Sequence, residues 1–225
     1  MNLYYDLHIH SCLSPCADEL MTPKNICSMA SLKGLDLIAL TDHNSAGNVR
    51  IAEKAAMEEG ILFLPGIEIC TQEEVHLLAY FDSCDACEEM GAYCYEYLPH
   101  IQNKPDFFGE QVYIGENNLP CRYEERLLIS ALTLSLEEVV QKVRSLGGVA
   151  VPAHIYRGNG IMTMLGFIPP QIGFTVVEIK VGEIPPAGLR SITSSDAHEL
   201  GAIAERKYKL NATNTREEVL AYLSY

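Results

Sequence analysis

The stretch from Asp6 to Ser11, Asp-Leu-His-Ile-His-Ser, contains the first residues whose types and spacing could bind a metal ion. It closes a short apolar run, Leu3 to Leu7. Residues two apart in an extended chain point to the same face, so His8 and His10 share one side of the strand. Two imidazole rings on one side can hold one ion. The alternative is a strand that carries two histidines by chance, and the pair alone does not decide between the two.

Four later stretches also end an apolar run with histidine or a carboxylate. They are Thr41-Asp42-His43-Asn44, Gly66-Ile67-Glu68 with His76, Pro152-Ala153-His154, and Ser195-Asp196-Ala197-His198. The chain has seven histidines, and only His100 lies outside these stretches. Chance would not concentrate them in this way, so we expect one site at the C-terminal ends of several strands. Mixed nitrogen and oxygen donors suit zinc, manganese or iron.

The elements that must position these residues are short. Apolar runs predict seven strands, at 3–7, 35–40, 61–67, 75–81, 149–151, 176–180 and 191–194. Capping signals and apolar periodicity predict helices at about 22–33, 49–59, 135–146 and 215–223. The third and fourth strands are too close in sequence for a helix between them. This pattern predicts one α/β domain over residues 1–225, with a barrel as the simplest arrangement.

Residues 82–133 do not follow this alternation and are interpreted as an insertion between the fourth and fifth strands. Tyr93, Tyr95 and Tyr97 alternate within it. Such tyrosines could form a face on which bases stack, but packing of the insertion against the domain is the favoured interpretation.

Composition restricts the partners. The formal net charge is −14 at pH 7, whereas binding of long nucleic acid by phosphate neutralisation requires a basic surface. We therefore expect a small substrate and no long nucleic acid. No long apolar segment and no signal peptide precede or interrupt the motifs, so we expect no membrane partner and a cytoplasmic location. The eight cysteines are expected to be reduced, and the sequence does not indicate an oligomeric state.

Taken together, the motifs resemble those of the PHP (polymerase and histidinol phosphatase) family of metal-dependent phosphoesterases. The resemblance spans residues 6–198 and rests on Asp-x-His-x-His-Ser, Thr-Asp-His-Asn, Gly-x-Glu followed by His-Leu-Leu-Ala-Tyr, His-x-x-Arg and Ser-Asp-x-His. It implies a distorted seven-stranded (β/α) barrel that holds three divalent ions, zinc, manganese or iron, at its mouth.

The resemblance also implies ligands for each ion. The first would be bound by His8, His10, Glu68 and Asp196, the second by His43, His198 and an early aspartate, and the third by Glu68 as a bridge with His76 and His154. Asp6 and Asp42 are expected to accept hydrogen bonds from ligand histidines.

The early aspartate is where this sequence departs from the family pattern. The family reads His-Ser-x-x-Ser-Asp-Gly before a proline-headed helix, whereas here Pro-Cys-Ala-Asp-Glu follows Ser14. Counting back from Pro23 places Asp18 at the family position, in preference to Glu19.

The implied reaction is attack on phosphorus by a hydroxide that bridges two ions. Arg157, three residues after His154, is expected to bind a phosphate oxygen, although a surface ion pair is an alternative. His198 or a metal-bound water would protonate the leaving oxygen.

The insertion and the short Thr-Asp-His-Asn stretch resemble small stand-alone family members, some of which act on nucleoside 3′,5′-bisphosphates or short oligonucleotides. We therefore expect a phosphomonoesterase acting on a small nucleotide such as a nucleoside 3′,5′-bisphosphate. Histidinol phosphate phosphatase is the alternative enzyme. A metal-loaded but catalytically silent regulatory module is the alternative of another class.

Overall fold

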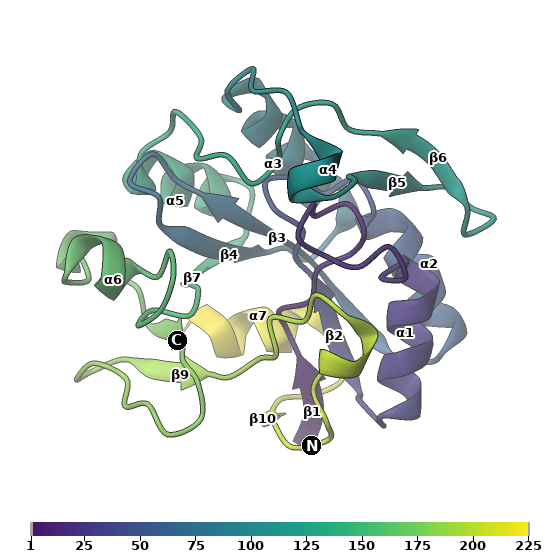
Figure 1. The fold of residues 1–225 in the computed structure, drawn as a ribbon. Helices are drawn as coiled ribbons and strands as arrows, with labels where there is room; N and C mark the ends of the chain where they lie inside the picture. Colours follow the sequence, from purple (N-terminus) through teal and green to yellow (C-terminus); the bar gives the residue numbers. More distant parts are fainter. Residues whose placement is uncertain (1, 225) are drawn as a thin grey trace.

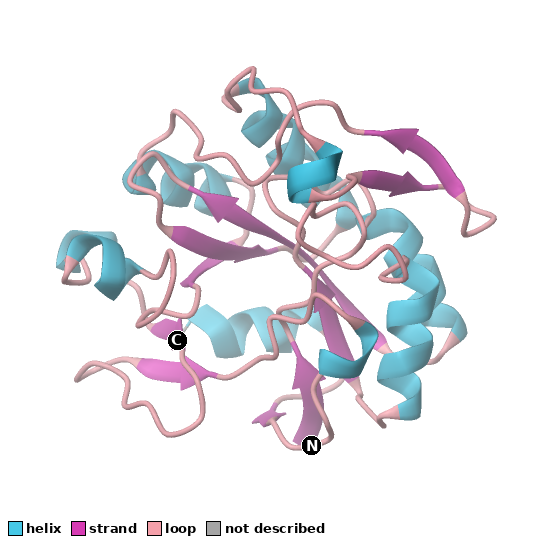
Figure 2. Ribbon diagram, viewed as in Figure 1, coloured by secondary structure: helices cyan, strands magenta, loops and turns pink. Residues whose placement is uncertain are grey.

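The main sheet has six strands in the order β10-β1-β2-β3-β4-β7, and helices cover it (Figures 1 and 2). The computed structural model describes residues 2–224, so the two end residues of the predicted 1–225 domain lie outside the described residues. The strands of this sheet are β1 (Asn2–Asp6), β2 (Leu37–Leu40), β3 (Leu62–Cys70), β4 (His76–Tyr80), β7 (Val149–Pro152) and β10 (Lys209–Asn211). Every residue of β2 is buried, which agrees with its continuous apolar sequence.

Strand directions follow from the lengths of the connections. β1, β2 and β3 are parallel, with helices in the connections between them. β4 is antiparallel to β3 and to β7, because the connection after β3 is too short for a crossover. The expectation that no helix separates the third and fourth strands is therefore confirmed. The edge strand β10, which pairs antiparallel with β1, was not predicted.

The predicted seven-stranded barrel is not confirmed. The last two predicted strands, β8 (Val176–Glu178) and β9 (Arg190–Ile192), form a separate parallel pair. After β7 the chain leaves the sheet through α6 (Ile161–Leu165) and the 3₁₀ turn η1 (Pro170–Ile172). Isolated contacts still link the two parts: Ile155 N–H donates to the Glu178 carbonyl at 3.0 Å, and Ile9 bridges Ala197. The fold is thus a mixed α/β fold with a curled, incompletely closed sheet.

Helices pack on both faces of the sheet. α1 (Pro23–Leu32) and α2 (Val49–Glu58) lie side by side, as Figure 1 shows. With α3 (Cys84–Glu96) and α5 (Leu136–Ser145) they contribute to the larger apolar cluster. α7 (Arg216–Ser224) contributes Val219, Leu220 and Leu223 to a second cluster with alternate strand residues such as Leu37 and Ala39. Alternation along β2, with Ile38 and Leu40 in the first cluster, divides the core in two.

The segment predicted as an insertion contains α3, α4 (Pro105–Phe108), β5 (Val112–Ile114) and β6 (Pro120–Tyr123). The β5–β6 hairpin projects at the upper right of Figure 1. The alternating tyrosines do not share a face, because they lie on or next to a helix. Tyr93 and Tyr97, four residues apart, pack together with ring centroids 4.9 Å apart, whereas Tyr95 lines a pocket on another side.

None of the helices in the described part of the chain has the length and apolar character that a membrane span requires. All eight cysteines are free.

Candidate metal centre

The residues predicted to bind metal follow strand ends that face one another. His8 and His10 come directly after β1, and the His10 N–H donates to the Ala197 carbonyl at 2.9 Å. His43 follows β2 and forms a bridge with Glu68 on β3. The curled sheet therefore brings together segments that are up to about 190 residues apart in the sequence, as the ends of barrel strands do.

Glu68 lies at the centre of the cluster. Its side chain is 1% exposed. Five histidine nitrogens lie 2.9–3.4 Å from its oxygens, those of His8, His10, His43, His76 and His154. A single carboxylate cannot accept hydrogen bonds from so many rings in good geometry, so this arrangement is one in which cations would share the carboxylate.

The distances between donor atoms fit a metal ion. Nε2 of His8 lies 3.1 Å from Nε2 of His10, and both lie 3.3–3.4 Å from Oδ1 of Asp196. Four ligands bound at about 2.1 Å to a zinc ion lie about 3.4 Å from one another. Two facing nitrogens without a proton between them would repel, which an ion would relieve.

The described residues form three groups of possible ligands, and within each group the ligand atoms lie within 4.8 Å of one another. These groups are His8, His10 and Glu68; His10, His43 and His198; and His43, Glu68 and His76. In addition, the buried Nδ1 atoms of His43 and His154 make no hydrogen bond among the described residues. Buried polar atoms rarely remain unpaired, and Nδ1 of His43, 3.1 Å from Oε2 of Glu68, is therefore placed to bind an ion. Nδ1 of His154 is the ring nitrogen that does not face Glu68.

The electrostatics of the cluster suit a cation. Burial opposes ionisation of Glu68, but the charges of the surrounding histidines hold its pKa well below the ordinary value. The pKa of Asp196 is lowered in the same way against the effect of burial. Burial, together with neighbouring histidines, lowers the pKa of His43 and of His198. The same carboxylates, against the effect of burial, raise the pKa of His8, of His10 and of His76. The cluster therefore favours positive charge at its centre, which a bound metal ion would supply while taking these rings in their neutral form.

Contrary to the expectation, Asp42 does not accept a hydrogen bond directly from a histidine ring, but it supports His10 through Ser14. The Ser14 hydroxyl donates to Oδ1 of Asp42 at 2.8 Å, and it lies 2.9 Å from Nδ1 of His10. Because the single hydroxyl proton is directed to Asp42, Nδ1 of His10 must be the donor to Ser14. This assignment leaves Nε2 of His10 unprotonated toward the cluster, and that one nitrogen can serve only one ion.

Glu178 is a site residue that the sequence did not reveal. It is buried at the end of β8, and its carboxylate lies 3.0–3.1 Å from Nδ1 of His8. It also accepts the backbone N–H of His154 at 2.9 Å. A carboxylate on the far nitrogen of a ligand histidine orients the ring and increases its basicity. The available sequence signal was a carboxylate at the end of the apolar run Val176-Val177-Glu178.

Asp6 does not contact a histidine ring, in contrast to the prediction. Its carboxylate accepts the N–H and hydroxyl of Ser195 at 3.0 and 2.5 Å and the N–H of Ala204 at 2.8 Å. The prediction was wrong because residues two apart on a strand share a face only while the strand stays regular, and β1 ends at Asp6. Asp6 instead fixes the segment that carries Asp196.

Asp18 does not join the cluster either. Its side chain is exposed, and Oδ1 accepts the N–H of Leu20 at 2.8 Å in a local turn. Only its backbone reaches the site, where its N–H donates to the His198 carbonyl at 2.8 Å. Glu19 is also exposed. Turn formation by aspartate competes with ligand binding, and spacing from Pro23 could not reveal this.

Asp18→Asn is therefore expected to leave kcat/KM for a phosphoester within about two-fold of the unmodified protein, because asparagine can form the same turn. Measurement of phosphate release and of metal content per chain would test this. A ten-fold loss, accompanied by loss of metal, would show that Asp18 is a ligand after all.

Arg157 and His198 lie at the open edge of the cluster. Nη1 of Arg157 donates to Oδ2 of Asp196 at 3.1 Å, and the side chain is 34% exposed. Nδ1 of His198 lies 2.8 Å from the Asp196 carbonyl, and its ring stacks on His10 at 4.3 Å. Both side chains can therefore meet a ligand that approaches from solvent.

Three residues of these loops have left-handed backbone conformations. Asn44, His154 and Asp196 have φ values of 48°, 29° and 57°. Such values are uncommon outside glycine and concentrate at functional sites, where the surrounding structure enforces them.

The fold and the donor set define the class of metal-dependent hydrolases. The model of the PHP domain matches residues 6–131, more than half of the chain, and the chain belongs to the PHP family. The resemblance stated from the motifs is thus confirmed. The prediction of a hydrolase acting on phosphoester bonds is confirmed at the level of the family.

Two relatives have names that record an activity. A 5′-3′ exoribonuclease of Haemophilus influenzae is 38% identical over 74 residues, and a 3′,5′-nucleoside bisphosphate phosphatase of Chromobacterium violaceum is 41% identical over 64 residues. These matches cover 33% and 28% of this chain, and 26% and 21% of the relatives. The chain therefore matches about a quarter of the length of each.

Among solved structures, the lesion-specific endonuclease Q of Pyrococcus furiosus has a TM-score of 0.72. At 20% identity, with 100% of this chain and 56% of the other covered, the match shows a shared fold. A second structure, endonuclease Q in complex with a 27-mer duplex that has an abasic lesion at the active site, covers 99% of this chain with a TM-score of 0.67 at 19% identity.

This comparison corrects the prediction that excluded long nucleic acid. Endonuclease Q, which shares the fold of this chain, was solved in complex with a duplex. The prediction was wrong because net charge sums the whole chain, whereas a nucleic acid contacts one face. Part of the negative charge is also buried in the site, where cations would neutralise it.

Proposed function

We propose that the chain hydrolyses a phosphoester of a nucleotide, either a free nucleotide such as a nucleoside 3′,5′-bisphosphate or the phosphorylated end of a nucleic acid. The observation that carries this proposal is the buried Glu68 surrounded by five histidines beside Asp196. A donor set of this size exceeds what one ion requires. The two relatives with named activities act, by their names, on nucleotide phosphoesters, which supports this class of substrate.

The proposed ligand sets keep the family assignment where donor atoms are close together. One ion would be held by His8, His10, Glu68 and Asp196. A second would use His43 and His198, and a third would use Glu68 with His76 and His154. When bound, divalent ions neutralise phosphate oxygens and lower the pKa of water to about 7.

The remaining roles belong to side chains of the protein. Arg157, already at Asp196, would turn its guanidinium toward a phosphate oxygen, for which its planar donors are suited. His198 donates Nδ1–H to a backbone carbonyl, so Nε2 is the atom that can bind an ion or exchange a proton with the leaving oxygen. Glu178 and the Asp42–Ser14 pair would hold the rings of His8 and His10 in place.

Phosphate release after loading with manganese, zinc or iron would test the proposal. The substrates would be adenosine 3′,5′-bisphosphate, histidinol phosphate, a mononucleotide and a short 5′-phosphorylated RNA. We expect turnover of the bisphosphate or of the RNA to exceed that of histidinol phosphate. Preference for histidinol phosphate would identify the alternative enzyme, and no release from any substrate by fully loaded protein would favour a silent regulatory module.

A further inference from the structure

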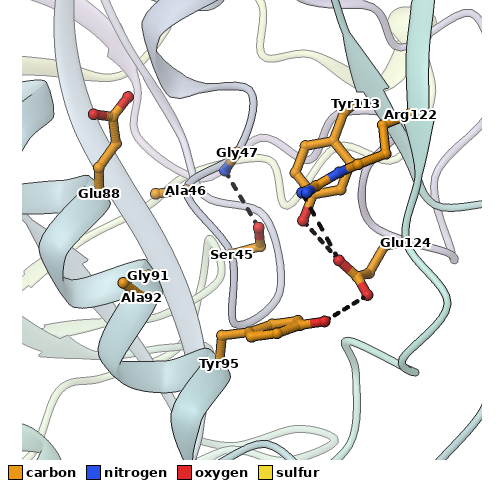
Figure 3. Close-up of a pocket in the computed structure, with 10 residues that line it drawn as sticks. All are labelled: Ser45, Ala46, Gly47, Glu88, Gly91, Ala92, Tyr95, Tyr113, Arg122 and Glu124. Atoms are coloured by element: carbon orange, nitrogen blue, oxygen red, sulfur yellow. Dashed lines mark hydrogen bonds and ion pairs between the residues drawn. The ribbon is translucent and has the colours of Figure 1, made fainter.

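A cavity of about 510 Å³ lies against the loop that follows His43 (Figure 3). The loop of residues 45–47, two residues beyond His43, forms one wall. α3 forms another through Glu88, Gly91, Ala92 and Tyr95, which share one face of the helix, and the third comes from the β5–β6 hairpin. Two glycines let these walls approach one another closely: a Cβ at Gly47 would come within 2.1 Å of the Tyr113 ring, and one at Gly91 within 3.0 Å of the Ala46 nitrogen.

A buried carboxylate organises the far side of this cavity. Glu124 is 8% exposed and accepts the hydroxyl protons of Tyr95 at 3.1 Å and of Tyr113 at 2.9 Å. Burial and the charge of Glu124 raise the pKa of Tyr113 to about 12, so its hydroxyl remains a donor. Figure 3 shows both rings directed toward Glu124, with Glu88 on the opposite side. The two rings are thus fixed in orientation rather than free to rotate.

One face of the Tyr95 ring remains available. The guanidinium of Arg126 covers the ring at 4.4 Å from the centroid, but Arg126 does not line the cavity. The side chain of Tyr95 is 37% exposed. The opposite ring face is therefore the one that a flat ligand in the cavity would contact.

Hydrogen bonds fix the hairpin wall of the cavity to the loops that carry the proposed metal ligands. The amide of Asn48 donates to the Ser11 hydroxyl at 2.9 Å and accepts the Ile114 N–H at 2.9 Å, and the Val112 N–H donates to the Cys12 carbonyl at 2.8 Å. The hairpin is thereby tied to the loops that carry His10 and His43. Only Asn44 lies between His43 and Ser45, so the Cα atoms of these two residues lie at most about 7.6 Å apart.

We infer that this cavity binds the nucleobase of the substrate, stacked on Tyr95, while the phosphate lies at the metal centre. The inference rests on the proposed function and extends it to base recognition. A flat heterocycle suits a fixed aromatic face beside the small side chains of Ala46 and Ala92. Glu88 and Glu124 already accept hydrogen bonds from Arg50 and from the two tyrosines, so the feature that the cavity offers a base is the Tyr95 ring.

The test compares a substrate that has a base with one that has none. For metal-loaded protein, Tyr95→Ala is expected to raise the KM for adenosine 3′,5′-bisphosphate, relative to that for ribose 5-phosphate, by about ten-fold or more. Tyr95→Phe keeps the ring and is expected to restore most of the wild-type ratio. Ala92→Leu, which fills the cavity from an exposed helix position without altering Glu124, is expected to reproduce the effect of Tyr95→Ala.

Tyr123→Ala is the matched control, because this exposed tyrosine of β6 lies outside the cavity and its loss should not change the ratio. Equal KM changes for both substrates, or an unchanged ratio in Ala92→Leu, would overturn the inference. A further comparison uses a short RNA with its terminal base and the same RNA without it. A difference in KM between the two RNAs would show that the cavity binds the base at a strand end, as well as or instead of that of a free nucleotide. If the wild-type protein released no phosphate at all, the proposed function would fail. Calorimetric binding of adenosine 5′-monophosphate to the wild type and to Ala92→Leu would then test separately whether the cavity binds a base, and equal affinities would overturn the inference.

Discussion

Replacement of Glu68 by glutamine is expected to lower kcat/KM for phosphoester hydrolysis by about a thousand-fold, equivalent to about 4 kcal/mol of transition-state stabilisation. The carboxylate lies within 3.4 Å of five histidine nitrogens, so it can contact more than one ion. An amide has no negative charge and offers one oxygen, so it cannot bridge cations. Metal content per chain should fall together with activity, as elemental analysis and phosphate release would show.

Glu58→Gln provides the control for Glu68→Gln, because Glu58 is an exposed glutamate on α2. It makes the same chemical change away from the site and should retain metal and turnover. Circular dichroism of both variants would establish that the fold persists. Full metal content and undiminished turnover in Glu68→Gln would refute the central role given to this carboxylate.

Glu178→Gln is expected to reduce metal affinity or turnover by about 10- to 100-fold. Glu178 does not belong to the ligand groups around Glu68, but it fixes His8 and the backbone of His154. Loss of its charge makes His8 a weaker donor and frees its ring to rotate. A metal titration followed by phosphate release would measure the effect.

Excess metal should separate the two variants. A positioning residue changes affinity, so high metal concentration should recover most of the turnover of Glu178→Gln, whereas Glu68→Gln should stay inactive. Glu217→Gln, at an exposed position on α7, is the matched control. If added metal did not restore the turnover of Glu178→Gln, Glu178 would have a direct role in the reaction and would not act only by orienting His8.

The strands were predictable because their apolar runs are short and continuous, and the helices α1, α2 and α5 because capping signals mark them. α3 was missed, since its buried face consists largely of cysteine and glycine: Cys84, Cys87, Gly91 and Cys94. These positions recur at helical spacing, but cysteine and glycine are not typical of the apolar face of a helix, so the pattern did not predict one. Closure of the barrel was overestimated because sequence cannot show where a chain leaves a sheet.

The histidines of the candidate centre were predictable because each lies at a strand end, and these ends meet at one edge. His76 differs from the others because it begins the antiparallel strand β4 instead of following a strand. Residues that act through irregular segments were not. Asp18 lies in a loop where turn geometry, rather than spacing, decides the direction of the side chain. Glu178 also ends an apolar stretch, but it lay inside the strand predicted at 176–180, and only the folded chain places it behind His8.

At His154 and Asp196, which have left-handed backbone conformations, the residue that would give the highest thermal stability differs from the residue that could bind metal. A non-glycine residue in this region costs about 1–3 kcal/mol, and glycine would remove much of that cost. Laboratory evolution scored only by melting temperature should therefore enrich glycine at both positions and discard two proposed ligands. Selection for a more thermostable variant of this protein must therefore include a measurement of metal-dependent activity in every round.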